Sequence, residues 1–316
     1  MMLLDRPVRH FEQEGRPVAG GGPAPPYGCL RPRATNGTVL ANSYETGHAS
    51  ELPPRPLATS VCAEGTSHKE RFMSDQKTAL VISAHAADFV WRCGGAIALH
   101  AEKGYQVTVV CLSFGERGES AKLWKDPGMT LDRVKSARRA EAEKAAQALG
   151  VHDLIEFDLG DYPLHLTQDD KFRLVDVIRK VQPAFMLSHS QYDPYNTDHM
   201  YATQIALECR MIAQAWGHNP GEKVLGAPQL YLFEPHQTEQ MGWKPDTFLD
   251  ITPVWDKKRA AIECMEGQEH LWEYYTRVAQ NRANHFMRNS GGQSGGRKAR
   301  YAEGFQSIFP RTVDEL

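Results

Sequence analysis

Long apolar runs are absent. None approaches the length needed to span a bilayer, and the first residues, MMLLDRPVRHFEQEGRP, lack the apolar segment of a secretory signal. Cysteine is scarce, and the six cysteines form no C-x-x-C pair, which favours reduced thiols over a disulfide framework. The charges nearly balance to a formal net charge of -3, so no overall field attracts nucleic acid or an anionic membrane. These absences predict a cytoplasmic protein with neither nucleic acid nor a membrane as a partner.

The first 72 residues differ in composition from the rest of the chain. They hold nine of the 19 prolines, in stretches such as GGGPAPPYG and ELPPRPLA, and show no sustained hydrophobic period. Such a segment buries too little apolar surface to offset the entropy lost on ordering. We expect a disordered N-terminal extension over 1–72 and a single domain over 73–316, which is long enough to bury a large core.

From residue 73 onward, strand-like and helix-like patterns alternate. The predicted strands are 79–85, 105–113, 153–160, 184–190, 229–235 and 247–252. The predicted helices are 93–104, 130–150, 169–183, 198–216 and 253–266. Strands separated by helices of this length imply right-handed βαβ units. The predicted class is α/β, with a Rossmann-like, mainly parallel sheet and helices on both faces. We expect NSGGQSGG, residues 289–296, to form a mobile loop in a C-terminal part that wraps the sheet edge.

Ionisable and polar side chains follow each of the first five predicted strands. In parallel sheets of this kind, ligands bind outside the carboxyl ends of the strands. The groups at these ends are more numerous than helix capping requires. They are His85, Asp88, Glu116, Arg117, Glu119, Asp158, Asp161, His189, Asp193, Asn196, Asp198, His199, Glu234 and His236.

Three of these residues have the chemistry of a metal site. His85 and Asp88 follow the first strand in the sequence HAAD, and His199 follows the fourth. Imidazole and carboxylate ligands suit zinc, and catalytic zinc sites use three protein ligands plus an open position. Taken singly, His85 is more simply a satisfied buried histidine and Asp88 a helix cap. Together with the second histidine-rich strand end, they favour the metal site.

The sequence resembles the LmbE-like (PIG-L) family of zinc-dependent deacetylases from about Lys77 to the C-terminus. The family motif A-H-P-D-D-E-x-x-G-C-G-G corresponds to AHAADFVWRCGG, residues 84–95, and the later motifs correspond to GERGES, RRAEAEKAAQALGV and NTDH. The combination is far more specific than any single motif. The resemblance implies an LmbE-like fold and places His85, Asp88 and His199 at the zinc-ligand positions.

The departures from the family pattern concern the hydrolytic residues. The aspartate that deprotonates the zinc-bound water in the family corresponds to Ala87, and the neighbouring glutamate corresponds to Phe89. The histidine that opens the family's H-P-D-H motif corresponds to Asn196. Alanine accepts no proton, so the deacetylase mechanism lacks its general base. The resemblance therefore implies different chemistry at the same zinc.

One branch of the family, the 4-oxalomesaconate hydratases, resembles this chain in SAHAADFVWRCGGAIALH, VTVVCLSFGERGESAKLW and FDLGDYPL. That resemblance implies addition of water to a C=C bond of an unsaturated tricarboxylate, giving 4-carboxy-4-hydroxy-2-oxoadipate in gallate and protocatechuate 4,5-cleavage catabolism. Zinc would polarise the conjugated system. We expect this small-molecule substrate, a Zn²⁺ cofactor and a homo-oligomer.

Hydration also needs acid–base groups and groups that bind carboxylates. The acid–base candidates are Glu119 and His236, with Glu116 as the substitute for Glu119. The substrate-binding candidates are Arg92, Arg117, Asn196 and Lys122. Each has an ordinary alternative, because a glutamate can stabilise its loop, an arginine can be solvated and a histidine can be structural.

Two other functions remain open at this point. The first is a zinc-dependent N-acyl sugar deacetylase in which another carboxylate replaces the missing base. The second is a metal-binding protein without catalysis, which the acid-rich set of strand ends disfavours.

Overall fold

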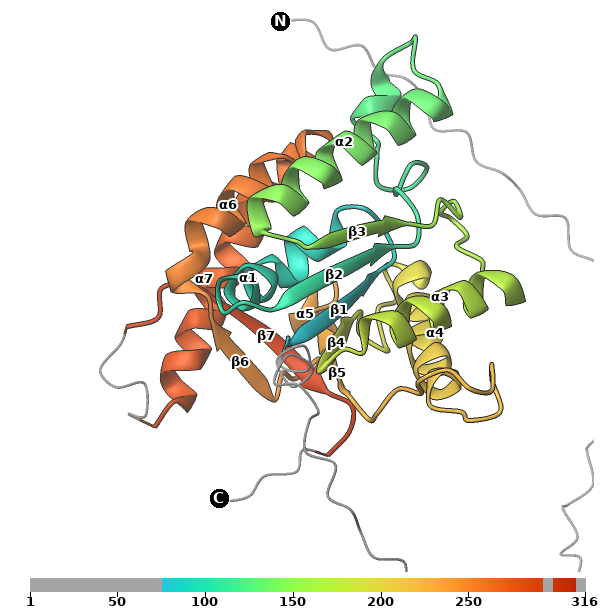
Figure 1. Cartoon of the computed structure of the whole chain (residues 1–316). Coiled ribbons are helices and arrows are strands. Elements are labelled where there is room, and N and C mark those ends of the chain that lie inside the picture. Colours follow the sequence, from blue (N-terminus) through green and yellow to red (C-terminus); the bar gives the residue numbers. More distant parts are fainter. Residues whose placement is uncertain (1–75, 292–297, 311–316) are drawn as a thin grey trace, which may run out of the picture. The chain divides into compact units, whose positions relative to one another are not determined.

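The structure is a computed structural model that describes residues 76–291 and 298–310 (Figure 1). These residues belong to one compact unit, Glu64–Leu316. The extension predicted over 1–72 and most of the loop predicted over 289–296 lie outside the described residues. Within the described ranges, no helix has both the length and the apolar character that crossing a membrane requires.

A seven-stranded sheet forms the centre of this unit, in the order β3-β2-β1-β4-β5-β7-β6. The first five strands of the chain are mutually parallel, and β7 runs antiparallel to both β5 and β6. The mainly parallel α/β fold is therefore confirmed. The strands are β1 Thr78–Ser83, β2 Gln106–Cys111, β3 Asp153–Glu156, β4 Phe185–Ser188, β5 Gln229–Phe233, β6 Thr247–Asp250 and β7 Ala302–Ser307.

Side-chain alternation along β1 builds two cores. Ala79 and Val81 point into one buried cluster, while Leu80 and Ile82 point into the other. A strand that is covered on both faces is expected to be apolar along its length, and in β1 the residues from Ala79 to Ile82 are all apolar. The carboxyl end of β1 therefore lies deep inside the molecule, where the chain continues into the candidate site.

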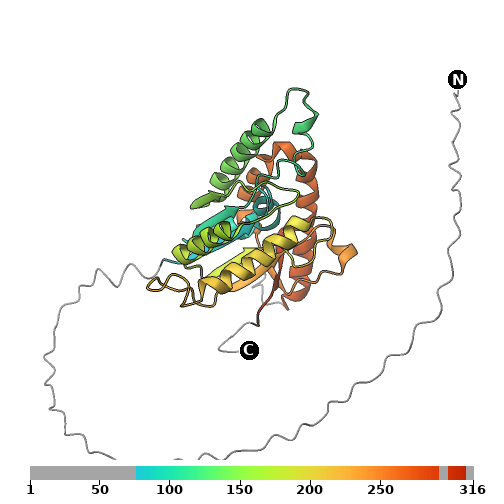
Figure 2. The same ribbon diagram turned by 90° about the vertical axis from the view of Figure 1, so that its right-hand side faces the viewer.

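Helices cover both faces of the sheet (Figures 1 and 2). The first cluster of buried residues joins the sheet to α1, α2, α6 and α7, and the second joins it to α3 and α4. The longer helices are α1 Asp88–Glu102, α2 Leu131–Leu149, α3 Gln168–Val181, α4 Thr197–Ala213, α6 Trp255–Glu263 and α7 Trp272–Asn289, and α5 is the short Thr238–Met241.

Helix α1 is interrupted in its middle. Cys93 has non-helical φ and ψ angles of -140° and 17°. The backbone N–H groups of Gly95 and Ala96 donate to the two carboxylate oxygens of Glu303 in β7, at 2.7 and 2.8 Å. The side chain of Lys258 in α6 donates to the same carboxylate at 2.5 Å. A Cβ on Gly95 would lie 2.6 Å from Ile251, so glycine permits the close packing here.

The structure corrects three of the predicted elements. The strand β7 was not predicted. The C-terminal part was expected to wrap the sheet edge, but this strand of it lies inside the sheet, between β5 and β6. Its sequence AEGFQS is short and polar and therefore does not predict a strand, although neighbouring strands flank it on both sides. The first helix begins at Asp88 instead of Cys93, and α7 was not predicted.

Candidate metal centre

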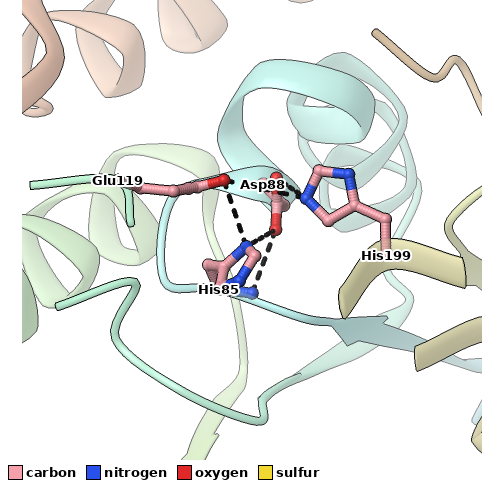
Figure 3. Close-up of side chains that lie close together, drawn as sticks. All are labelled: His85, Asp88, Glu119 and His199. Atoms are coloured by element: carbon pink, nitrogen blue, oxygen red, sulfur yellow. Dashed lines mark hydrogen bonds and ion pairs between the residues drawn. The ribbon is translucent and has the colours of Figure 1, made fainter. Parts of the chain in front are cut away.

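Three loops at the carboxyl edge of the sheet bring four side chains together (Figure 3). His85 follows β1, and Asp88 is the first residue of α1. Glu119 lies in the turn after β2, and His199 lies in the first turn of α4. Each of these residues offers a ligand atom within 4.8 Å of the others.

The distances between these atoms match the spacing of metal ligands. His85 Nδ1 lies 3.1 Å from Asp88 Oδ2 and 3.2 Å from Glu119 Oε1. His199 Nε2 lies 3.3 Å from Asp88 Oδ1 and 3.7 Å from Glu119 Oε1. Nitrogen and oxygen atoms that surround zinc tetrahedrally at about 2.0–2.1 Å lie roughly 3.3 Å from one another. The four side chains are therefore spaced for a single small cation.

Each histidine of the cluster has a carboxylate on its far side. His85 Nε2 lies 3.3 Å from Asp198 Oδ2, and His199 Nδ1 lies 2.9 Å from Asp193 Oδ2. Ligating histidines usually hold a carboxylate in this way, which fixes the ring orientation. The other nitrogen of His199, Nε2, is buried with no hydrogen-bond partner among the described residues. An orphaned nitrogen that points into the cluster is the observation a bound cation would explain.

The electrostatics of the cluster favour positive charge. Burial lowers the pKa of His85, but the surrounding carboxylates, led by Glu119, outweigh it and raise the pKa well above its usual value. Burial raises the pKa of Asp88, but the charges of His199 and His189 hold that pKa well below its usual value. Carboxylates that draw protons onto neighbouring histidines would equally attract a divalent cation. The donor chemistry and charge together fit a metal-binding site.

Glu119 belongs to this cluster and also lines the cavity beside it. Its Oε1 accepts a hydrogen bond from Asn196 Nδ2 at 3.2 Å. Burial raises the pKa of the Glu119 carboxyl, but the charge of His85 outweighs burial and lowers it below its usual value. The sequence indicated an acid–base candidate, and the structure places the carboxylate against the predicted metal ligands.

Arg92 and His236 form a second layer behind Asp88. Arg92 Nε donates to Asp88 Oδ1 at 3.3 Å, and its Nη2 lies 3.1 Å from His236 Nε2. His236 Nδ1 lies 3.2 Å from Asp193 Oδ2. Burial and the charge of Arg92 lower the pKa of His236. The Arg92 side chain is only 1% exposed, and it also donates to the backbone oxygen of Glu234, so its hydrogen bonds go to protein groups.

Three other candidates lie apart from the cluster. Glu116 accepts from the Phe114 backbone N–H at 3.2 Å, and burial raises the pKa of its carboxyl. Arg117 donates to the backbone oxygen of Asp161 at 2.7 Å. Lys122 is half exposed and pairs with Glu269 at 2.7 Å.

A cavity of about 300 Å³ opens beside the cluster. Its polar lining includes Glu119, Asn196 and His236 from the sequence candidates, together with Tyr162 and Gln268. No role was predicted from the sequence for Tyr162, although it lies in the stretch FDLGDYPL that resembles the hydratase branch, or for Gln268, which lies in no motif. Asp193 and Asp198 did stand out as ionisable groups at a strand end, but nothing in the sequence assigned them to particular histidines.

Residues 80–210 match the GlcNAc-PI de-N-acetylase family, PIG-L. A 4-oxalmesaconate hydratase of Pseudomonas putida is 61% identical over 256 residues, which cover 81% of this chain and 98% of that relative. The chain belongs to the PIG-L family. The family resemblance drawn from HAAD, GERGES and NTDH is therefore confirmed.

Other known proteins resemble the chain to different extents. The crystal structure of the 4-carboxy-2-hydroxymuconate hydratase from Pseudomonas putida is 63% identical, with a TM-score of 0.74, and covers 76% of this chain and 100% of the solved chain. The diacetylchitobiose deacetylase of Thermococcus kodakarensis is 28% identical over 244 residues, which cover 74% of this chain and 84% of that relative.

Proposed function

We propose that this chain is a metal-dependent 4-oxalomesaconate hydratase, which adds water to 4-oxalomesaconate (4-carboxy-2-hydroxymuconate) and gives 4-carboxy-4-hydroxy-2-oxoadipate. The observation that carries the proposal is the 61% identity to a 4-oxalmesaconate hydratase across 98% of that relative's length. The candidate metal centre supports the proposal independently. It has residues that can hold a metal, and it has Ala87 where the family's deacetylases have their catalytic aspartate.

The missing residue is the deacetylase base. Ala87, at the N-cap position of α1, is fully buried between His85 and Asp88. The family resemblance gives this position to the aspartate that deprotonates water during amide hydrolysis. An alanine methyl group accepts no proton, so this chain keeps the donor set for a metal without that base. The arrangement favours addition of water to carbon over amide cleavage.

His85, Asp88 and His199 would hold the metal, and their nitrogen and oxygen donors suit zinc. Bound zinc would supply a Lewis acid that polarises the substrate's oxo or enol oxygen. Asp198 and Asp193 would keep the two imidazole rings in their ligating orientation.

Glu119 is the base in this proposal. Its carboxylate lines the cavity and lies 3.2 Å from His85 Nδ1, so it can take a proton from a water that attacks beside the metal centre. Asn196, which lines the same cavity, donates to Glu119 Oε1 and fixes the direction of that carboxylate. Asn196 stands where the family's deacetylases have a histidine, so this position orients a carboxylate here instead of exchanging a proton.

His236 in its protonated form would give a proton to the second carbon of the double bond, and the proton that Glu119 takes from water would then replace it, so that the net reaction adds one water. The His236 ring lines the cavity and stacks on His199, with 5.1 Å between ring centroids. Asp193 and Arg92 hold it from behind. We assign Arg92 to positioning His236 and Asp88, because its hydrogen bonds go to protein groups.

Product analysis tests this function. Zinc-loaded protein is mixed with 4-carboxy-2-hydroxymuconate, and the loss of the conjugated ultraviolet absorbance is followed while the product is identified by NMR. In parallel, acetate release is measured from N,N'-diacetylchitobiose. We expect 4-carboxy-4-hydroxy-2-oxoadipate and no acetate. Acetate release without hydration would instead support the N-acyl sugar deacetylase.

A further inference from the structure

The cavity beside the candidate metal centre contains no arginine or lysine in its lining. This is unexpected for the proposed substrate, which has three carboxylates. Arg117 donates a hydrogen bond to the backbone oxygen of Asp161, and Lys122 forms an ion pair with Glu269. Neither Arg117 nor Lys122 lines the cavity. Besides the two histidines, His236 and His270, the side chains of the lining that can donate a hydrogen bond to a substrate carboxylate are therefore neutral.

Tyr162 has such a donor, and its direction follows from Asn196. Asn196 Oδ1 accepts from the backbone N–H of Asp198 at 3.1 Å, so the amide nitrogen Nδ2 must face the other way. From there Nδ2 donates to Glu119 at 3.2 Å and to the Tyr162 hydroxyl oxygen at 2.9 Å. The Tyr162 oxygen is thus an acceptor, and no described residue accepts its proton. That proton is available to a molecule in the cavity.

Gln268 has the same arrangement. Its Oε1 accepts a hydrogen bond from Arg138 Nη2 at 2.9 Å, so its amide nitrogen is the free end of the side chain. Arg138 is fully buried and is itself paired with Glu141, which keeps the guanidinium in place. Within the described ranges, no group accepts from Gln268 Nε2. Gln268 lines the same cavity as Tyr162.

Several contacts hold Tyr162 in place, although the residue is 40% exposed. Its backbone N–H donates to Asp198 Oδ2 at 2.9 Å, on the carboxylate that also contacts His85. Its ring covers Gly118, where a Cβ would lie 1.0 Å from a ring carbon. Its φ of +44° lies in the left-handed region, which is costly for a bulky side chain and persists where surrounding contacts impose it. Such strain concentrates at ligand-binding positions.

We propose that Tyr162 and Gln268 form a carboxylate-binding subsite of neutral donors, which holds one carboxylate of the tricarboxylate substrate in the cavity. The acceptor end of each side chain is occupied by the protein and the donor end is left for an anion. This subsite rests on the proposed function for the identity of the substrate, but an anion that undergoes no reaction can probe it.

Two conservative variants test the subsite. Tyr162→Phe removes the hydroxyl proton, and Gln268→Glu keeps an oxygen for Arg138 while it replaces the donor by a carboxylate. Tyr105→Phe is the matched control, because Tyr105 lies before β2 at the opposite edge of the sheet. For each zinc-loaded protein, the metal content, the KM and kcat of hydration, and the Kd of propane-1,2,3-tricarboxylate by calorimetry are measured.

We expect KM and Kd to rise about tenfold to a hundredfold in both variants, the scale of a hydrogen bond to a charged group. The metal content should stay at the wild-type level and kcat should change far less than KM. Tyr105→Phe should match the wild type. A purely structural role would instead lower the metal content or kcat.

The outcomes separate this inference from the proposed function. If the wild type hydrates the muconate and either variant keeps the wild-type KM and Kd, the subsite is refuted and the function stands. If the wild type does not hydrate it but binds the tricarboxylate, and both variants weaken that binding, the subsite stands and the function fails. A wild type that neither hydrates nor binds refutes both.

Discussion

Two glutamates in one turn, Glu116 and Glu119, illustrate how surroundings decide a residue's role. They follow the end of β2 by five and eight residues, and both carry the same functional group. Glu116 faces the Phe114 backbone N–H and Lys135, away from the cavity. Glu119 faces His85 and lines the cavity. We therefore propose acid–base chemistry for Glu119 and not for Glu116.

The paired variants Glu119→Gln and Glu116→Gln test this assignment. We expect Glu119→Gln to lower kcat by about a hundredfold or more, because an amide accepts no proton from water. Glu116→Gln keeps the acceptor for the Phe114 N–H and should leave kcat within about threefold. Steady-state kinetics with metal content measured for each variant provide the comparison. A larger loss in Glu116→Gln would reverse the ranking.

At the residue scale, the sequence predicted those site residues that lie directly after strands in recognisable motifs. His85, Asp88 and His199 are such residues, and the structure brings all three together. Tyr162 and Gln268 could not be predicted in this way. Their positions in the cavity depend on how a loop and a short 3-10 segment, η3 Glu266–Leu271, pack against distant elements. That packing is a property of the tertiary structure, which local patterns do not determine.

Among the elements, the interrupted α1 is the one that links the sheet to the site. Its first half begins at Asp88 and includes Arg92, and its second half begins anew near Gly95. The carboxylate of Glu303 caps this second start, and Lys258 neutralises the carboxylate. Both side chains of the pair are at most 4% exposed. The pair therefore fixes the break in α1, and with it the direction of the residues that precede the break.

Removing the charge of Glu303 from its buried pair with Lys258 should lower the stability of the protein. We expect Glu303→Gln to lower the free energy of unfolding by about 3 kcal/mol, because Lys258 is left buried without a compensating charge. Glu102→Gln is the control: its ion pair with Lys257 is about half exposed, so it should cost less than about 1 kcal/mol. Urea denaturation of the two variants measures the difference. Equal losses would mean that the Glu303 pair does not stabilise the break.

Helices and strands differ in how clearly the sequence marks their ends, so only some elements were predicted. Helices with a cap at both ends, such as α2 between Thr130 and Gly150, were predicted nearly to the residue. The strand β7 was missed because two of its first three residues are Glu303 and Gly304, which are unfavourable in strands. Glu303 is buried there because of its contacts with α1 and α6, which lie far away in the sequence.

For the whole molecule, the parallel order of β2, β1, β4 and β5 is what assembles the chemistry. The loops after these four strands supply Glu119, His85, His199 and His236 in turn, so residues more than 100 positions apart meet at one edge. The assembly gathers buried carboxylates whose charge the histidines and Arg92 only partly offset. A divalent cation would complete that balance, and we propose that hydration depends on it.

The most direct test of this account is the hydration rate as a function of bound metal. Protein stripped by a chelator is titrated with zinc, and the bound metal per chain and the rate of muconate consumption are measured together, with Asp88→Ala alongside. We expect no activity in the stripped protein, a rate that rises in proportion to bound zinc up to one ion per chain, and no recovery in Asp88→Ala because one of the three ligands is lost. Hydration at the wild-type rate by metal-free protein, or none from a chain with its full zinc, would contradict the account.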